Sequence, residues 1–565
     1  MLKPMSTFPT SGSGGDRTLH HGYSAASPAM MRSYALTRES AVALALGGLA
    51  VAGVILCQDW RLAAVLGGLF AVAILTWFPF FGLMLVVAVV FIGTPSLKIS
   101  HARGVVTHLF PAMLLLPPVL LGFLARSAAA SRPAVWRPPS LTPLTPFIAA
   151  VVALHLLGLA WAPHTLFAVG QLVTLGFDAL LFFAVVAAVS DPGRLQALAW
   201  ATVLSGVLVC AAMFCGVYYD WAGTLHLARG VELNFELFSE ERWGRIGGLC
   251  SANQAGGFLV LATFQAIGLS RVYRRWRRVG LSLLAMLFLT FVVVSGSRGA
   301  ILGFCGAAGA FMLFHPATRR RLLSRTTLLV LVLAGAILAG KPSFIDRMLV
   351  GFGYSGPLIF TDKKKSDSAA NVSGSGARFR MWKDALSVMA DQPELMLLGL
   401  GPGGFIWHTR EPEVHSLWLA FFFDLGLLGG LTGILGLATL SVALAQALKR
   451  TPPGPARTLF VAAVVGGLAE LGIHSLIDHD LTSPVSRFAW LYLSIVAAAL
   501  QVVRKGSELT LAAPMENAHA PMPVRCPDPW PAAPALGGNT PVLPGPACAA
   551  NVGQTGPGHG RAGTH

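Results

Sequence analysis

Charged side chains are scarce in this sequence of 565 residues. Only 12% of its residues are Asp, Glu, Lys or Arg, and 54% are hydrophobic, whereas a typical soluble domain carries roughly 25% charged residues. The mean hydropathy is +0.66. This shortage of charge excludes a soluble enzyme, a secreted disulfide scaffold and a disordered protein as descriptions of the body of the chain.

Paired cysteines, nucleotide loops and removable leaders are also lacking. The seven cysteines form no CxxC or Cys/His metal spacing, and most lie in apolar runs, where they act as small apolar residues. No glycine-rich turn is followed by the Lys-Ser/Thr of a phosphate-binding loop. Residues 1–38 contain no short apolar core with a cleavage site, so we expect no signal peptide. We therefore predict neither a metal nor a cofactor.

Long apolar runs are abundant instead, and each is long enough to cross a membrane. No alternation with a period of two appears, which favours helices over strands. The sequence predicts an all-α, polytopic transmembrane helix bundle with about 12–14 spans and one long extracytoplasmic loop. The expected spans are 40–57, 61–78, 79–94, 106–126, 144–161, 166–190, 196–219, 247–270, 279–296, 298–314, 326–340, 415–447, 457–477 and 486–503.

Two spans carry finer expectations. The spans 61–78 and 79–94 share a Pro/Phe hinge near Pro79 and can form one hairpin that does not fully cross. The run from 415 is expected to hold a short interfacial helix before its true span. Outside the bundle, residues 1–38 and the Pro/Gly/Ala-rich segment 506–565 read as flexible tails, because they cannot bury enough apolar surface to fold.

The net charge of +16 is concentrated in short turns between spans, which favours topology over nucleic-acid binding. The arginine clusters at 271–278 and 319–325 mark the cytoplasmic side by the positive-inside rule. With fourteen spans, all the remaining basic turns then also fall in the cytoplasm, and so do both termini. The segments 220–246 and 341–413 fall outside, and a polar loop as long as 341–413 is uncommon without a function.

Several residues expected on the outer side suit an anionic substrate. Arg298 lies between two apolar runs joined by almost no loop, where an unpaired charge is costly; it either snorkels to the interface or binds an anion. Arg378 and Arg380 end the polar part of the long loop and can form bidentate, charge-assisted hydrogen bonds. Gly401 and Gly403 lie in a glycine-rich turn whose amides can approach an anion, although such a turn is commonly only structural.

Histidines on the same side are candidates for proton transfer. His415 opens an apolar run, and His is the usual general base near neutral pH, although a lone interfacial His is often structural. His474, Asp478 and His479 cluster in the last outer turn. Because His474 and Asp478 supply only two ligands on one helix face, a polar rim that orients a sugar is favoured over a metal site.

The order and spacing of these elements over residues 240–500 resemble the O-antigen ligase and O-antigen polymerase superfamily. The resemblance comprises Asn253, the Ser297-Arg298-Gly299-Ala300 element, Arg378 to Trp382, the 399–405 turn, and His415 with the 426–430 turn. Two positions depart from the family pattern, which more often has Asn at Ser416 and Glu at Asp424. On this basis 241–505 is the ligase-like domain, with the periplasmic loop 341–413, and 39–240 holds N-terminal transmembrane helices.

The resemblance implies a bacterial inner-membrane glycosyltransferase with a periplasmic site. It implies metal-independent transfer from an undecaprenyl-diphosphate-linked oligosaccharide or polysaccharide to a glycan or lipid A core acceptor. Arg298 and His415 would be catalytic, and Arg378, Arg380, Asn253, Gly401 and Gly403 would bind the diphosphate. Flippase and chain-length regulator proteins are its expected partners, beside membrane lipids, and nucleic acid is not.

The sequence leaves the kind of transfer open. We lean slightly to a polymerase, because about fourteen spans exceed those expected of a minimal ligase. The alternatives are an O-antigen ligase acting on lipid A core and a flippase or transporter for the lipid-linked sugar. The transporter reading is less favoured, because the polar groups gather at one face and no internal repeat is found.

Overall fold

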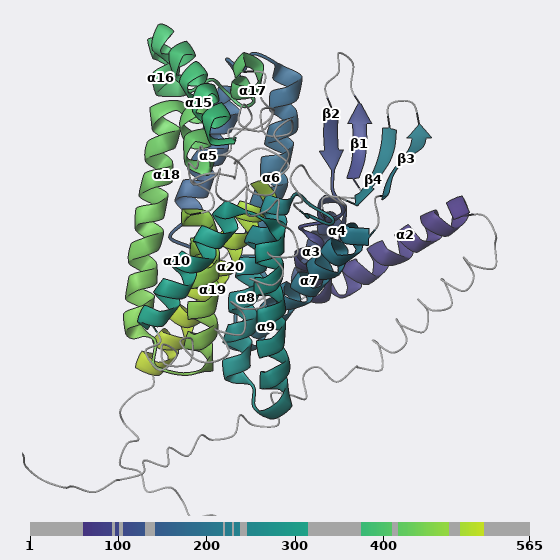
Figure 1. Ribbon diagram of the computed structural model, residues 1–565, viewed down its shortest axis with the longest axis vertical. Helices are drawn as coiled ribbons and strands as arrows, with labels where there is room; N and C mark the ends of the chain where they lie inside the picture. Colours follow the sequence, from purple (N-terminus) through teal and green to yellow (C-terminus); the bar gives the residue numbers. More distant parts are fainter. Residues whose placement is uncertain are drawn as a thin grey trace, which may run out of the picture. The chain divides into compact units, whose positions relative to one another are not determined.

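The helices of the computed structural model follow the apolar runs of the sequence (Figure 1). The structure describes residues 60–92, 96–100, 106–129, 142–218, 221–228, 231–237, 246–314, 374–409, 416–473 and 486–512. Within this part, 7 helices are long and apolar enough to cross a membrane, or up to 8 if one bent pair is a single span. The chain is a polytopic helical membrane protein.

All but two of the expected spans coincide with described helices; 40–57 and 326–340 lie outside the described residues. The helices are α2 (Trp60–Trp77), α3 (Pro79–Val89), α4 (Pro111–Ala129), α5 (Thr145–Gly158), α6 (Thr165–Ala188), α7 (Pro192–Tyr218), α8 (Ala252–Val272), α9 (Arg275–Ser295), α10 (Arg298–Phe314), α15 (Gly374–Asp391), α16 (Pro393–Leu398), α17 (Gly404–Thr409), α18 (Leu417–Arg450), α19 (Pro455–Gly472) and α20 (Ser486–Ala512).

The expected hinge near Pro79 is confirmed. Helices α2 and α3 bend by 120° at this break, where Pro79 occupies the first turn of α3 and cannot continue the hydrogen bonding of α2. On the concave side, a Cβ on Gly82 would come 2.7 Å from Val119 of α4. Arg126 at the end of α4 donates a hydrogen bond of 2.6 Å to the carbonyl of Trp77, which ties down the exposed end of α2.

Helices α8 and α20 form the interior of the bundle, since 83% of each span is buried, against 33% for α9 and 22% for the long apolar span of α18. Small residues permit this packing: a Cβ on Gly268 of α8 would lie 2.7 Å from the Ala462 side chain of α19. Close backbone approach of this kind drives helix association in lipid. The sparsely buried α9 and α18 therefore present most of their apolar surface to the membrane.

A four-stranded antiparallel sheet accompanies the helices, which the sequence analysis did not anticipate. Its order is β2-β1-β4-β3, with β1 (Ser96–Ser100), β2 (Val106–Leu109), β3 (Trp221–Ala228) and β4 (Val231–Leu237). The expected span 106–126 is therefore wrong at its start: 106–109 is strand, and the helix begins at Pro111.

The sheet also tests the membrane topology. Strand β1 lies between α3 and α4, and its partner β4 lies between α7 and α8. Two connections that share backbone hydrogen bonds must lie on the same side of the membrane. The alternation of sides along the predicted spans places both connections on the outer side. We call this side the sheet face. The turn between α8 and α9 lies at the opposite end of these helices.

Arg487 is a buried cation at the start of α20, with 4% of its surface exposed. Its guanidinium carbon lies 3.7 Å from the ring centre of Phe110, and the Asp178 carboxylate of α6 attracts it electrostatically. Among the described residues, none accepts a hydrogen bond from its Nε or Nη1. Asp178 is itself 3% exposed, so each charge depends on the other in a medium of low dielectric constant.

We expect Arg487→Met to lower the stability of the folded protein by about 3–5 kcal/mol, because it leaves Asp178 buried without its counter-charge. Thermal unfolding of the purified protein in detergent measures this loss. Adding Asp178→Asn to the Arg487→Met background should recover part of it, since the uncompensated charge is then removed. Strictly additive losses from the two substitutions would contradict the pairing.

Candidate functional site

The turn between α9 and α10 places Arg298 at a helix N-terminus. Gly296 ends α9 in the left-handed conformation with a φ of 64°, which glycine adopts without steric cost. Ser297 is 1% exposed, and its Oγ accepts a hydrogen bond of 3.3 Å from the amide of Ala300. The Ser-Gly-Ser-Arg sequence thus encodes a reversal, a helix cap and a half-buried arginine.

The start of α8 packs against this turn. Ser251 and Gln254 form a reciprocal capping box that fixes the first turn of α8. A Cβ on Gly256 would lie 2.6 Å from Ser295 Oγ and 3.2 Å from Ser297 Cβ. Asn253 precedes Gly256 by three residues, so it lies on the same face of α8. The structure therefore places Asn253 and Arg298 at one end of the bundle.

This end of the bundle is electropositive for two reasons. Helices α8 and α10 both begin here, and a helix N-terminus carries about half a positive charge together with free amide donors. Arg298 adds a full charge at the first position of α10. Its side chain is half-buried and makes an interaction within the chain. The arrangement suits an anion that approaches along the sheet face.

Arg378 and Arg380 lie in the first half of α15, and their side chains lie outside the described part. The buried face of α15 carries Met381, Ala385 and Met389, which are at most 8% exposed. Arg378 precedes Ala385 by seven residues, so it occupies a position on this face. Arg380 instead occupies a position on the exposed face of α15. The helix packs on α16 and α17, as Figure 1 shows.

The glycine-rich turn is built into the bundle. The amide of Leu400 donates to the Phe423 carbonyl at 2.7 Å, and that of Gly401 donates to the Asp424 carbonyl at 3.1 Å. Gly401 and Gly403 both have positive φ. A Cβ on Gly401 would lie 3.1 Å from Ala162, and one on Gly403 would meet the ring of Phe167. Backbone conformation and close packing thus account for glycine at both positions, and their diphosphate role stays a prediction.

Helix α18 reverses direction at Gly426, whose φ is 63° and ψ −158°. A Cβ on Gly433 would lie 3.3 Å from the ring of Phe421, although a straight helix would separate these residues by about 18 Å. Segment 417–425 therefore folds back along segment 427–450. The expected short helix before the true span exists, but it runs along that span rather than flat on the membrane surface. Ser416 begins it and is 2% exposed.

Four of the candidate residues lie outside the described part of the chain: His415, His474, Asp478 and His479. Within the described part, no group of three His, Cys, Asp or Glu side chains could hold a metal. Ser416 caps α18, and its Oγ accepts a hydrogen bond of 3.4 Å from the Leu419 amide. This capping explains why Ser is suited to the position after His415.

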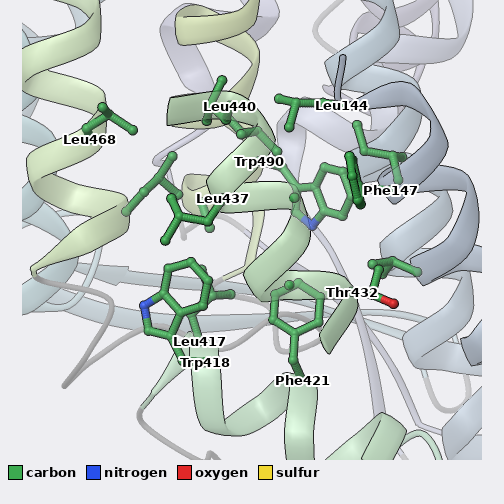
Figure 2. A pocket seen from close by; sticks show the side chains of 17 residues that line it. Leu144, Phe147, Leu417, Trp418, Phe421, Thr432, Leu437, Leu440, Leu468 and Trp490 are labelled. Atoms are coloured by element: carbon green, nitrogen blue, oxygen red, sulfur yellow. The ribbon is translucent and has the colours of Figure 1, made fainter. Parts of the chain in front are cut away.

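An apolar cavity of about 110 Å³ lies beside the start of α18. Figure 2 shows Trp418 and Phe421 from the first segment of α18 facing Leu437 and Leu440 from the second. Residues of α5, α19 and α20 complete the lining, in which the Thr432 hydroxyl is the main polar group. Its apolar lining suits hydrocarbon better than water.

Two polar residues at the start of α6 and within it lie beside the glycine-rich turn and are not among the predicted site residues. His164 caps α6 by accepting from the Phe167 amide at 3.2 Å, and its ring lies 5.4 Å from that of Trp407 in α17. Gln171 is 8% exposed, and among the described residues none donates to its Oε1. These residues precede the region of resemblance, so only an interruption of an apolar run by His and Gln marks them.

Part of the chain matches a family of known proteins. Residues 283–434 match the O-antigen ligase family. Over this segment the chain resembles the O-antigen ligase and polymerase superfamily. The match spans Arg298, α15, the glycine-rich turn and the reversal of α18, and it ends before α19. No curated protein matches the chain. The O-antigen ligase-like chain is accordingly a multi-pass inner-membrane protein and an enzyme of glycan transfer.

We expect Gly426→Ala to destabilise the ligase-like protein by about 1–3 kcal/mol, because the substitution forces a side chain into left-handed φ. The added Cβ would also collide with the backbone of Leu397 and Gly399. Gly280→Ala in α9 is the matched control, since no atom lies within 4 Å of its new Cβ. Thermal unfolding compares the two variants. Equal melting temperatures would contradict a tight backbone contact between Gly426 and the segment Leu397–Gly399.

Proposed function

We propose that this O-antigen ligase-like protein transfers an undecaprenyl-diphosphate-linked glycan to an acceptor hydroxyl on the periplasmic face. The observation that carries the proposal is the convergence of Arg298 with the N-termini of α8 and α10. The leaving diphosphate gains negative charge as the bond between sugar and phosphate breaks. Fixed cations and helix dipoles stabilise that charge most strongly in a partly dehydrated site.

The remaining candidates complete the proposed chemistry. Arg378, with Arg380, would bind the diphosphate from α15, and Asn253 would do so from α8. His415 would accept the proton of the attacking hydroxyl, while His474, Asp478 or His479 would orient the sugar. In this proposal the arginines, rather than a metal, neutralise the charge of the leaving diphosphate.

The apolar surroundings of α18 are compatible with a donor that is linked to a lipid carrier. Ser416 follows the proposed base and is buried, and Leu417 and Trp418 line the apolar cavity. Because segment 417–425 folds back from the reversal, Ser416 lies about 15 Å along the helix from Gly426. The reaction would thus take place below the outer edge of the bundle, beside room for hydrocarbon.

The site faces the periplasm in this proposal, because the sheet face lies opposite the arginine-rich α8–α9 turn and the positive-inside rule assigns that turn to the cytoplasm. Both termini would then be cytoplasmic. Within the superfamily we favour a polymerase, which joins two lipid-linked glycans, over a ligase that uses lipid A core. The two differ in the acceptor alone, so the acceptor decides between them.

Purified protein in lipid, supplied with an undecaprenyl-diphosphate-linked repeat unit, should yield transferred glycan. His415→Ala should abolish the product, and Arg298→Lys should reduce it strongly, because Lys cannot reproduce the planar fork. Gel separation of the glycans measures both. A ladder formed without added acceptor indicates a polymerase, and one capped product that requires lipid A core indicates a ligase. Full activity of His415→Ala would sink the assignment of the base.

We expect Gly436→Leu to raise the KM for a long-chain donor, because the new side chain enters the apolar cavity. A Cβ at this position meets Phe147 at 3.4 Å, an ordinary contact, so the first atom of the new side chain fits without a clash. Gly176→Leu in α6, whose Cβ would meet no atom within 4 Å, is the control. If both variants kept the wild-type KM for that donor, the cavity would have no part in binding it.

A further inference from the structure

The turn between α8 and α9 carries an unusual concentration of arginine. Helix α8 ends at Val272 and α9 begins at Arg275, so Arg274, Arg275, Arg277 and Arg278 crowd one short reversal. Arg275 has a φ of 53° and is the one non-glycine residue with positive φ among the described residues. Tyr273 anchors the turn to α7, because its hydroxyl accepts hydrogen bonds from Trp200, at 3.1 Å, and from Gln196.

These four arginines differ from arginines elsewhere on the same membrane face. Arg126, Arg194 and Arg457 each donate to a backbone carbonyl at 2.6–2.9 Å. In contrast, no hydrogen bond or ion pair joins the four side chains of the α8–α9 turn to any other described residue. Their positive charges repel one another, and no described residue compensates them, so the turn presents a site for an external anion.

An apolar stripe extends from the arginines along α9. Trp276 is 75% exposed, and Val279, Leu283 and Leu287 follow it on one face with 41–59% of their surface exposed. The spacing of three to four residues aligns them on the lipid-facing side of the helix. Trp276 also contacts the cluster, since the Arg277 guanidinium lies 5.6 Å from its ring centre. Tryptophan at this depth marks the membrane interface.

We propose that the α8–α9 turn and the adjoining face of α9 form a binding site for an anionic glycerophospholipid. The phosphate would bind Arg274, Arg275, Arg277 and Arg278, and the acyl chains would lie along the stripe that begins at Trp276. Arginine is suited to this role, because its guanidinium binds phosphate bidentately and sheds water more readily than an ammonium group. The site lies at the end of α8 opposite Asn253 and is independent of the proposed transfer.

Native mass spectrometry of the full-length protein in detergent tests the site by titration with phosphatidylglycerol and, separately, phosphatidylcholine. The quadruple variant R274Q/R275Q/R277Q/R278Q should lose affinity for phosphatidylglycerol by about tenfold or more, because each basic residue near a membrane contributes to anionic lipid binding. Its binding of phosphatidylcholine should stay unchanged. Trp276→Ala should weaken phosphatidylglycerol binding while leaving the charge intact.

The matched control is K449Q/R450Q/R457Q, which removes basic residues from another turn on the same face. It should retain most of the affinity for phosphatidylglycerol. An equal loss in this control, or an unchanged affinity in the quadruple variant, would overturn the proposal in favour of a general charge effect. Competition by glycerol phosphate as strong as that of the whole lipid would overturn it in favour of a simple phosphate site. If the quadruple variant does not fold, the pairs R274Q/R275Q and R277Q/R278Q replace it, each with a smaller expected loss.

Discussion

The backbone contact between Gly426 and the segment Leu397–Gly399 holds the two parts of the candidate site together. Each glycine of this contact leaves no room for a Cβ, because the opposing backbone occupies that space. The neighbouring amides of Leu400 and Gly401 donate to the carbonyls of α18 at the reversal. A membrane-embedded break in a helix frees carbonyls that lipid cannot satisfy. The glycine-rich turn supplies the missing donors, so turn and reversal require each other.

This contact determines how deep the candidate site lies in the bundle and where the residues that line it are placed. The reversal sends segment 417–425 back into the bundle, where Trp418 and Phe421 face Leu437 across the apolar cavity. The same turn rests on α5 and α6 through Gly401 and Gly403. Loss of left-handed φ at one glycine would therefore move the wall of the cavity, the start of α18 and the segment that carries the proposed base.

The sequence could predict those features that depend on local pattern. Apolar length located the helices, and Pro79 located the bend between α2 and α3, because each signal lies within one turn or span. The glycines at 426–430 indicate a break in the run from 415, but the sequence does not show that the chain folds back at Gly426, since the cause lies in a distant backbone segment. The sheet is hidden for the same reason: β1 has five residues, and its partner β4 lies more than one hundred positions away.

Burial at the start of α18 also bears on the choice between transfer and hydrolysis. In the proposed reaction, water competes with the acceptor hydroxyl for the anomeric carbon, and only its exclusion favours transfer. Ser416 is 2% exposed, and the neighbouring cavity is lined almost entirely by hydrocarbon. A medium of low dielectric constant also strengthens the attraction between Arg298 and a leaving diphosphate. In this proposal, exclusion of water at the start of α18 would supply both selectivity for the acceptor and stabilisation of the leaving group.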